Sequence, residues 1–282
     1  HKAAISINDH FKAPSISWMD RFVVFSVYEG PGKADIMIGD YTLTYKKRVV
    51  SGGLNIFPKW ADKEQKTIYY TSYNYKKPTL VKLNIYNRSK DVIMDSDGML
   101  ACSDVNADGT KLLVTASPTG QPDVFLYDTR TRAKKQITTY SGIDVGGQFV
   151  ENDSKIVFVS DRLGNPNIFA QTIGSSGVER LVFHSNNNSS VTSSGNNVIF
   201  SSKDASNEMG KSFNLYLIST KSDSLKRLTS SGVNQFPKFS TDGQSVLFIK
   251  TDGTSSVGII RLEHNKSFLF PLAGKRIQSI DW

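Results

Sequence analysis

A short run of mostly apolar residues recurs six times along the chain. The runs begin at Phe22, Ile68, Leu112, Ile156, Val198 and Val246, so that their starts are 46, 44, 44, 42 and 48 residues apart. A fixed period in this range is typical of a β-propeller blade or of a solenoid repeat. We call these runs the marker runs, and they carry most of what the sequence says about the fold.

Each repeat contains three more runs of strand character besides the marker run. Turn-forming Gly, Asn, Asp, Ser or Pro residues separate the four runs. A third run follows the marker, as at residues 124–127, and a fourth follows a group of basic residues, as at 136–138, 181–183 and 228–229. Four strands repeated six times predict an all-β, six-bladed β-propeller. A parallel β-helix is excluded because its period is much shorter.

The first run of each repeat is predicted to be the innermost strand of its blade. Residues 55–60 read Asn-Ile-Phe-Pro-Lys-Trp, and residues 234–239 repeat this pattern as Asn-Gln-Phe-Pro-Lys-Phe. A sixth inner run, at residues 277–282, has no blade of its own after it. We therefore expect it to pair with the first blade, whose other strands lie within residues 22–50. Such pairing closes the ring and removes its exposed strand edges.

The first 13 residues lie outside this repeat. Ala3, Ala4, Ile7 and Phe11 have helical spacing, and Pro14 marks a stop. The sequence predicts a helical segment or linker over residues 1–13 and a propeller over residues 14–282. Residues 15–18 resemble one more inner strand that competes with residues 277–282 for the same place, and the C-terminal strand is favoured because each blade then has one inner strand.

The formal charge of +8 is spread along the chain rather than gathered in one region. Basic residues occur once per repeat, just before or at the start of the fourth run, as at residues 46–48, 134–135 and 226–227. Lysines on an outer strand block edge-to-edge pairing, whereas a nucleic-acid surface gathers them on one face. We expect no nucleic-acid partner. We also expect no membrane insertion, because no apolar run approaches the roughly 18–20 residues that span a bilayer.

Candidate catalytic and metal-binding residues are sparse. The four histidines lack metal-ligand spacing, and the single cysteine, Cys102, excludes a disulfide framework or a cysteine metal site. Residues 104–109 match the opening of a calcium loop, but Thr115 stands where that loop requires glutamate, so we interpret the segment as a turn. Asp104, Glu151 and Asp281 are too few for a channel metal cage. The sequence predicts no catalytic residue, metal or cofactor.

Several turns resemble those of one known family. Residues 160–169, Ser-Asp-Arg-Leu-Gly-Asn-Pro-Asn-Ile-Phe, resemble the signature turn of TolB-type propeller repeats. Residues 107–112 and 240–243 resemble the family's Ser-Pro-Asp-Gly turn without its proline. The stretch from residue 14 to 282 is similar to the carboxy-terminal propeller of the TolB family, and residues 1–12 resemble the end of the helix that closes the family's amino-terminal domain. The same turns occur in propellers of the prolyl oligopeptidase class, and the six-repeat layout with its terminal inner strand is the more specific feature.

This resemblance implies a non-enzymatic, monomeric protein of the periplasm that belongs to the Tol-Pal envelope-integrity system. In that family the propeller binds Pal, the peptidoglycan-associated lipoprotein, at one end of its channel, and the amino-terminal domain binds TolA. That domain is missing here, so TolA binding is expected only through it. The family's Pal-contact positions correspond to Met99, Cys102 and Val145, with Asp144 beside the last of these.

The repeat pattern independently points to the same end of the ring. Loops that lead into inner strands and loops that follow marker runs open on one end, where they carry single apolar residues such as Leu54, Met99, Ile143, Val145 and Val233. Binding residues commonly lie on loops of a rigid scaffold. Two alternatives remain open. One is a propeller hydrolase or lyase with a channel metal near Asp104 or Asp281, and the other is the regulatory propeller of a prolyl oligopeptidase-type protein.

Overall fold

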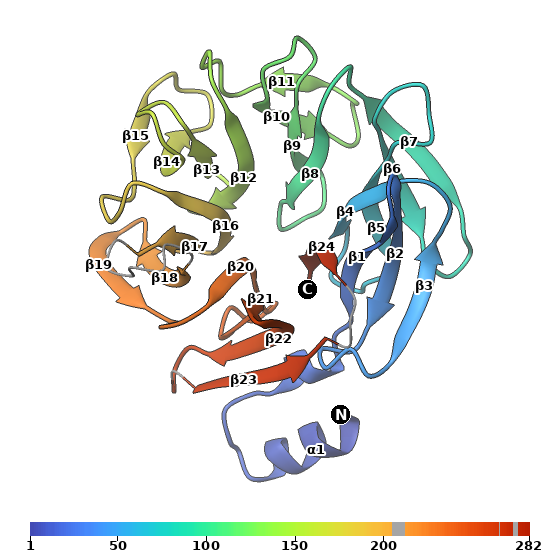
Figure 1. Cartoon of the computed structure of the whole chain (residues 1–282), viewed down its shortest axis with the longest axis vertical. Helices are drawn as coiled ribbons and strands as arrows, with labels where there is room; N and C mark the ends of the chain where they lie inside the picture. Colours follow the sequence, from blue (N-terminus) through green and yellow to red (C-terminus); the bar gives the residue numbers. More distant parts are fainter. Residues whose placement is uncertain (205–211, 265, 273–275) are drawn as a thin grey trace.

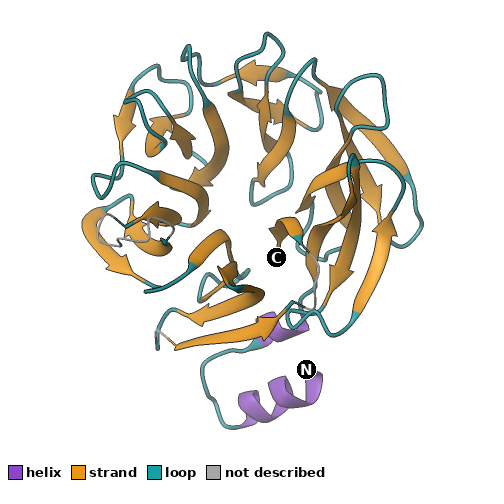
Figure 2. Ribbon diagram, in the orientation of Figure 1, coloured by secondary structure: helices purple, strands orange, loops and turns teal. Residues whose placement is uncertain are grey.

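The chain forms short β-sheets arranged around a central axis (Figure 1). The computed structural model describes residues 1–204, 212–264, 266–272 and 276–282. Colour follows the sequence around the axis, and the first and last strands meet beside each other. Strands and loops dominate the ribbon in Figure 2, together with helix α1 (Lys2–His10) and the short 3-10 helix η1 (Ser17–Asp20). The predicted N-terminal helix is thus present, and the fold is all-β in its main body.

Six strands, one from each repeat, lie nearest the axis, and we call them the inner strands. They are β24 (Ile277–Asp281), β4 (Asn55–Trp60), β8 (Leu100–Val105), β12 (Asp144–Val150), β16 (Asn188–Ser194) and β20 (Val233–Phe239). Each contacts the next in this order, and β20 contacts β24. They therefore line the axis along which a channel can run.

Three further strands extend outward from each inner strand. The second strands are β1 (Val23–Gly30), β5 (Thr67–Ser72), β9 (Lys111–Ala116), β13 (Lys155–Ser160), β17 (Asn197–Lys203) and β21 (Ser245–Asp252). The third strands are β2 (Lys33–Gly39), β6 (Thr79–Asn84), β10 (Asp123–Asp128), β14 (Asn167–Thr172), β18 (Phe213–Ser219) and β22 (Thr254–Arg261). The outer strands are β3 (Lys46–Val50), β7 (Lys90–Asp95), β11 (Lys134–Gln136), β15 (Val178–Arg180), β19 (Ser222–Arg227) and β23 (Lys266–Pro271).

These strands pair as four sheets of four strands and one of eight. The eight-stranded sheet joins β16–β19 to β20–β23 through one parallel pair, Phe213 with Val233. Among the described residues the strands within each four-stranded unit pair antiparallel, so the chain reverses direction at every turn of a unit, and an isolated parallel bridge joins Ala34 to Leu54.

The marker runs coincide with the second strands, which are buried on both faces. In β9, Leu112, Leu113 and Val114 all have no exposed surface. Side chains of a strand alternate between its two faces, and each face here packs against a neighbouring sheet: Leu113 joins one apolar cluster and Leu112 another. A strand that is buried on both sides needs a continuous apolar run, which explains why the repeat is so visible in the sequence.

Three of the outer strands, β3, β7 and β23, contain the apolar residues predicted for them, whereas the other three end earlier than the apolar pattern predicts. Ile137, Val182 and Leu228 were expected within outer strands, but β11, β15 and β19 end before them. β11 and β19 consist of exposed residues, most of them polar or basic, and β15 has one exposed glutamate between two partly buried residues. The apolar residues follow the strands and turn inward, where each is at most 8% exposed. The basic residues on the outer strands agree with the expected polar edge.

The C-terminal strand β24 pairs with β1 and so joins the two ends of the chain. Val24 lies opposite Asp281, and Phe25 lies opposite Ile280. The predicted pairing of residues 277–282 with the first repeat is confirmed. The competing strand at residues 15–18 is wrong: η1 begins at Ser17, and the inner edge of β1 is already occupied by β24. Trp18 instead packs its ring edge-on against Trp282, with ring centroids 5.5 Å apart.

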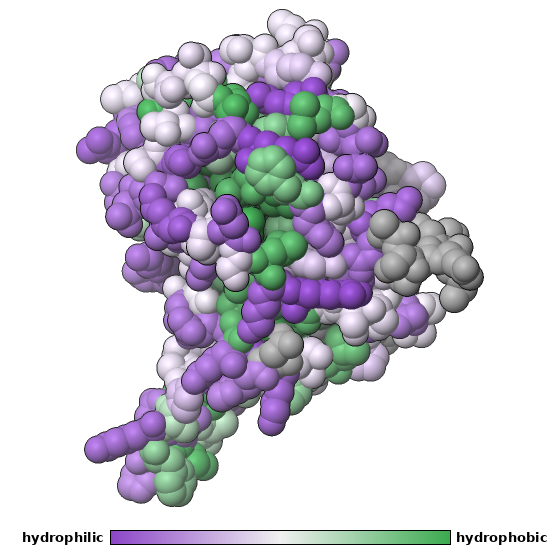
Figure 3. Space-filling view, turned by 90° about the vertical axis from the view of Figure 1, so that its left-hand side faces the viewer, coloured by the Kyte–Doolittle hydropathy of each residue, from purple (hydrophilic) through white to green (hydrophobic). Residues whose placement is uncertain are grey.

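Helix α1 projects from the body of the molecule at the lower left of Figure 3. Within the described residues it buries no side chain, and Ile7 and Phe11 are 60% and 75% exposed. Apolar and polar atoms therefore share its surface. Within the same residues, no helix has the length and apolar character that crossing a membrane requires.

Deleting residues 277–282 is expected to destabilise the whole body. The deletion removes buried Ile277, Ile280 and Trp282 from the apolar cluster that links the first and last sheets, and it exposes the inner edge of β1. We expect a loss of at least about 4 kcal/mol in the free energy of unfolding, measured by urea denaturation. Deleting residues 1–11 is the control, and its melting midpoint should stay within about 2 °C of the parent. Equal midpoints for both deletions would contradict closure through β24.

Candidate functional site

Two sets of loops gather at one end of the central axis. Because the strands of a unit alternate in direction, loops that precede inner strands and loops between second and third strands lie on the same end, which we call the loop face. Exposed large apolar residues in or beside these loops are Tyr28, Tyr73, Tyr75, Met99, Ile143, Leu163 and Phe183. Such residues suit a protein interface, whose centre is enriched in aromatic and Met side chains.

A cavity of about 250 Å³ lies in the channel among the inner strands. Met99, just before β8, and Cys102, within it, line it together with Val145 of the neighbouring inner strand β12. Met99 is 37% exposed, Val145 is partly buried, and Cys102 is buried. Three of the four residues implied by the family resemblance therefore converge on one cavity.

Phe57 and Phe236 form further walls of this cavity, and both have left-handed backbones, with φ of 55° and 54°. The pairing of every inner strand with its second strand is interrupted there by a register shift. Such bulges redirect side chains and recur next to binding sites. A left-handed conformation costs a non-glycine residue roughly 1–2 kcal/mol. The fold therefore holds both rings at the channel against local strain.

Asp144, the fourth candidate, does not line the cavity. Its side chain is fully buried and accepts hydrogen bonds on both carboxylate oxygens from Nη2 of Arg162, at 3.1 and 3.0 Å. The Arg162 guanidinium also lies over the rings of Tyr140, Phe158 and Phe169, 5.0–5.4 Å from their centroids. Asp144 therefore fixes the start of β12, next to Val145, and its carboxylate is not available to a partner.

Three other inner strands have a buried asparagine as their first or second residue, and it has a similar role. Asn55, Asn188 and Asn234 each donate a side-chain N–H to a carbonyl of the loop before the strand, at 2.8, 2.8 and 2.9 Å. A buried polar group of this kind is costly unless it is bonded, so these bonds favour a single loop conformation. The loops of the loop face are thus braced from within.

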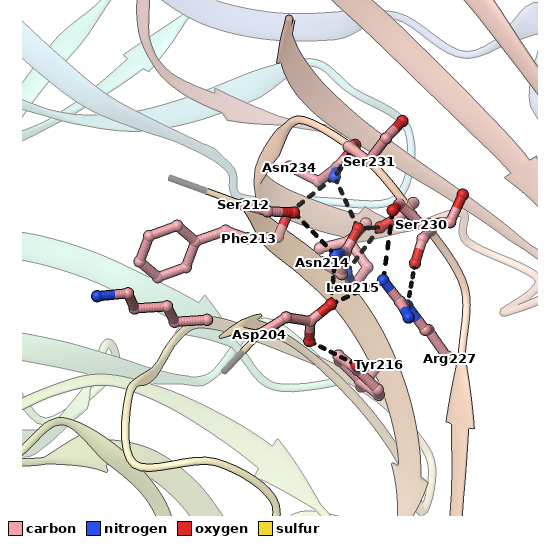
Figure 4. Close-up of polar contacts among 12 residues, drawn as sticks. Asp204, Ser212, Phe213, Asn214, Leu215, Tyr216, Arg227, Ser230, Ser231 and Asn234 are labelled. Atoms are coloured by element: carbon pink, nitrogen blue, oxygen red, sulfur yellow. Dashed lines mark hydrogen bonds and ion pairs between the residues drawn. The ribbon is translucent and has the colours of Figure 1, made fainter. Parts of the chain in front are cut away.

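Figure 4 shows the bonds that surround Asn234. Asp204 accepts hydrogen bonds from Asn214, Tyr216 and Arg227, each at 2.7 Å. Burial, together with the bond to Asp204, raises the pKa of Tyr216 to about 12, so its hydroxyl remains a donor at neutral pH. The second and third strands of this unit are thereby tied to the loop that leads into β20.

Charged side chains cross the channel below the cavity. Lys59 Nζ lies 3.0 Å from Asp281 Oδ1 and 3.4 Å from Asp104 Oδ1. The other oxygen of each carboxylate accepts a backbone N–H of the next inner strand, Trp60 for Asp281 and Phe149 for Asp104, both at 2.9 Å. Burial acts to lower the pKa of Lys59, but Asp281 and Asp104 outweigh it, and the pKa is raised. Four inner strands are linked by these contacts.

Asp104 and Asp281, the carboxylates in the alternative hypothesis of a channel metal, are therefore paired with Lys59. Within the part of the chain that the structure describes, no three His, Cys, Asp or Glu side chains gather as a metal site. An ammonium group between two carboxylates neutralises the charge that would attract a divalent cation. No role was predicted for Lys59 or Lys238 from the sequence, although both belong to the Phe-Pro-Lys segment that repeats at residues 57–59 and 236–238.

Comparisons with known proteins agree with this architecture. The family model of the TolB beta propeller domain matches residues 12–278. The chain is 52% identical to the Tol-Pal system protein TolB of Wolinella succinogenes and 49% identical to that of Campylobacter jejuni, and the alignments cover all of this chain and 68% and 70% of those proteins. The chain belongs to the TolB family. These TolB relatives are named as proteins of the Tol-Pal system, and the matching family model is that of a propeller domain.

A solved structure of a TolB protein shares the fold. The crystal structure of TolB from Acinetobacter baumannii superposes with a TM-score of 0.87 at 22% sequence identity, covering all of this chain and 71% of that one. At this identity the likeness shows the fold alone. The family assignment rests on the closer sequence relatives of the TolB family.

Replacing Lys59 by methionine should strongly destabilise the protein. The change leaves two largely buried carboxylates with one distant ammonium, and breaking a buried ion pair costs about 3–5 kcal/mol. Urea denaturation followed by tryptophan fluorescence measures the loss. The double variant Lys59→Met with Asp104→Asn keeps Asp281 beside Lys238 and should recover part of it. A single variant as stable as the parent would show that the ion pairs contribute nothing.

Cys102 is expected to be inert in the native protein. Burial raises the pKa of its thiol, whose Sγ lies 3.6 Å from the carbonyl oxygen of Asp104. Each unit by which a thiol pKa rises removes a factor of ten in reactive thiolate. Alkylation by iodoacetamide at pH 8 should be at least about tenfold slower than in guanidinium-unfolded protein, as measured by mass spectrometry. Equal rates in both states would contradict this burial.

Proposed function

We propose that this chain is the Pal-binding propeller of a periplasmic Tol-Pal system protein. The observation that carries the proposal is the cavity on the channel axis, where Met99 and Cys102 of one unit meet Val145 of the next. Its relatives bear the name Tol-Pal system protein TolB. A channel lined by apolar residues and surrounded by exposed aromatic side chains can receive an inserted segment of a protein partner.

Met99 and Val145 are the residues proposed to contact Pal. Both line the cavity and retain exposed surface. Cys102 serves as a buried wall beneath them. Asp144 acts indirectly, since its bonds to Arg162 hold the first residues of β12 in place. The arrangement separates residues that touch the partner from those that keep the loops in position.

We further propose that the body is a six-bladed ring over residues 14–282, closed by β24. The pairing of β24 with β1 and the cyclic order of contacts among the inner strands support this reading. Residues 1–13 would then connect the ring to the TolA-binding domain expected from the family. The exposed Ile7 on α1 and the exposed Phe11 just after it suit packing against such a domain. Basic outer strands favour a monomer, because they oppose pairing between molecules.

Substitutions at the cavity should weaken Pal binding without unfolding the protein. Val145→Asp or Met99→Asp places a carboxylate in an apolar contact, and we expect at least about a tenfold rise in Kd, or about 1.4 kcal/mol. Isothermal titration with Pal that lacks its lipid anchor measures the affinity. Thermal melting checks the fold, and its midpoint should barely change.

The matched control is Val92→Asp on the outer strand β7, where the side chain is 53% exposed and lies far from the channel. Its affinity for Pal should equal that of the parent. Unaltered affinity in both cavity variants would place the Pal site elsewhere. No binding of Pal by the parent chain would reject the proposed function itself.

A further inference from the structure

The two ends of the channel differ in charge. Among the described residues that line the cavity below the loop face, Lys59 and Lys238 are the charged ones, and none is an aspartate or glutamate. A second cavity, of about 370 Å³, opens towards the other end, and its lining includes Asp104 and Asp281. Lys59 reaches both cavities, whereas Lys238 lines only the first of the two. The charged residues of the cavity near the loop face are therefore all basic, whereas acidic residues outnumber Arg21, Lys59 and Lys63 in the lining of the cavity at the other end.

Lys238 is the less satisfied of the two lysines. Its Nζ lies 3.9 Å from Asp281 Oδ1, and within the described residues the structure gives it no hydrogen bond. The same oxygen of Asp281 is 3.0 Å from Lys59, so it is already engaged. The Lys238 side chain is only 18% exposed. Burial, followed by repulsion from Lys59, lowers the pKa of Lys238. An additional anion within reach would stabilise this ammonium.

The surroundings of Lys238 strengthen any such contact. Phe57, Phe236, Met99 and Val145 form apolar walls on the loop-face side. A charge pair enclosed by apolar groups is screened less than one in water. A ligand that combines an apolar stem with a carboxylate matches this cavity better than a neutral or cationic one.

We propose that this cavity receives a carboxylate carried by an acidic side chain of the partner, which pairs with Lys238. The proposal rests on the proposed function, since it assigns a chemistry to the segment of Pal that enters the channel. Lys59 keeps the two aspartates on the opposite side and so prevents them from repelling the incoming group. A small free carboxylate shares the same chemistry, and the test separates the two sources.

The first arm measures Pal binding by variants at two lysines. Lys238→Met removes the charge while keeping the length of the side chain, and we expect Kd to rise at least tenfold. Lys238→Arg keeps the charge and should retain most of the affinity. Lys63→Met is the matched control, because Lys63 lines the cavity at the other end of the channel. Thermal melting verifies that each variant is folded.

The second arm identifies the acidic group on the partner. Each aspartate and glutamate of Pal is replaced by its amide, and the variants are titrated against the parent chain and against Lys238→Met. We expect one amide variant to lose as much affinity as Lys238→Met does, with no further loss when the two are combined. If Pal binds the parent and Lys238→Met equally well, the proposal is overturned while the proposed function stands.

The third arm uses a probe that does not depend on Pal. N-acetylglutamate amide, with N-acetylglutamine amide as its neutral match, is titrated while the side-chain nitrogen signal of Lys238 is followed by NMR. If the parent chain fails to bind Pal, this titration alone tests the proposed carboxylate pocket. A shift of the Lys238 signal by the glutamate compound alone supports the carboxylate pocket as a small-molecule site, and the absence of such a shift overturns it. If Pal binding depends on Lys238 and the free probe has no effect, the carboxylate comes from the partner protein.

Discussion

The carboxylate of Asp281 is the point where the ends of the chain and the channel are held together. Asp281 lies on β24, which pairs with β1. Its carboxylate accepts hydrogen bonds from the backbone N–H of Trp60 and from the ammonium of Lys59, both on β4. Asp104 repeats this geometry between β8 and β12. Largely buried charges of this kind are tolerated only when each has a partner and satisfied hydrogen bonds. The positions of four inner strands are therefore coupled through a few polar contacts on the axis.

This coupling fixes the inner strands from which the loops of the loop face extend. Apolar clusters between neighbouring sheets supply the bulk of the stabilisation, and the buried asparagines at the starts of inner strands hold the loops above them. The strained backbones of Phe57 and Phe236 persist because the surrounding strands fix them. A partner that enters the channel thus meets a prepared surface, which lowers the entropy lost on binding.

The parts of the fold that the sequence predicted well are those with period-specific patterns. The marker runs were visible because the second strands are buried on both faces. Three of the outer strands, β11, β15 and β19, were misplaced by a few residues because the buried apolar residues of those repeats follow the strand rather than form it. Residues 15–18 were ambiguous for another reason: Trp18 is buried by contact with Trp282, and a buried aromatic residue alone does not indicate a strand.

For the candidate site, the repeat positions predicted which loops share one end of the axis, but they did not indicate the surroundings of each side chain. Met99, Cys102 and Val145 meet in one cavity, whereas Asp144 is turned away into an ion pair with Arg162. The sequence by itself determined the repeat, the all-β architecture and the offset of the last strand, because hydrophobic periodicity records which faces of a strand are buried. Only the tertiary structure decided which charges meet on the axis and which way each faces, because those contacts join residues as far apart as Lys59 and Asp281.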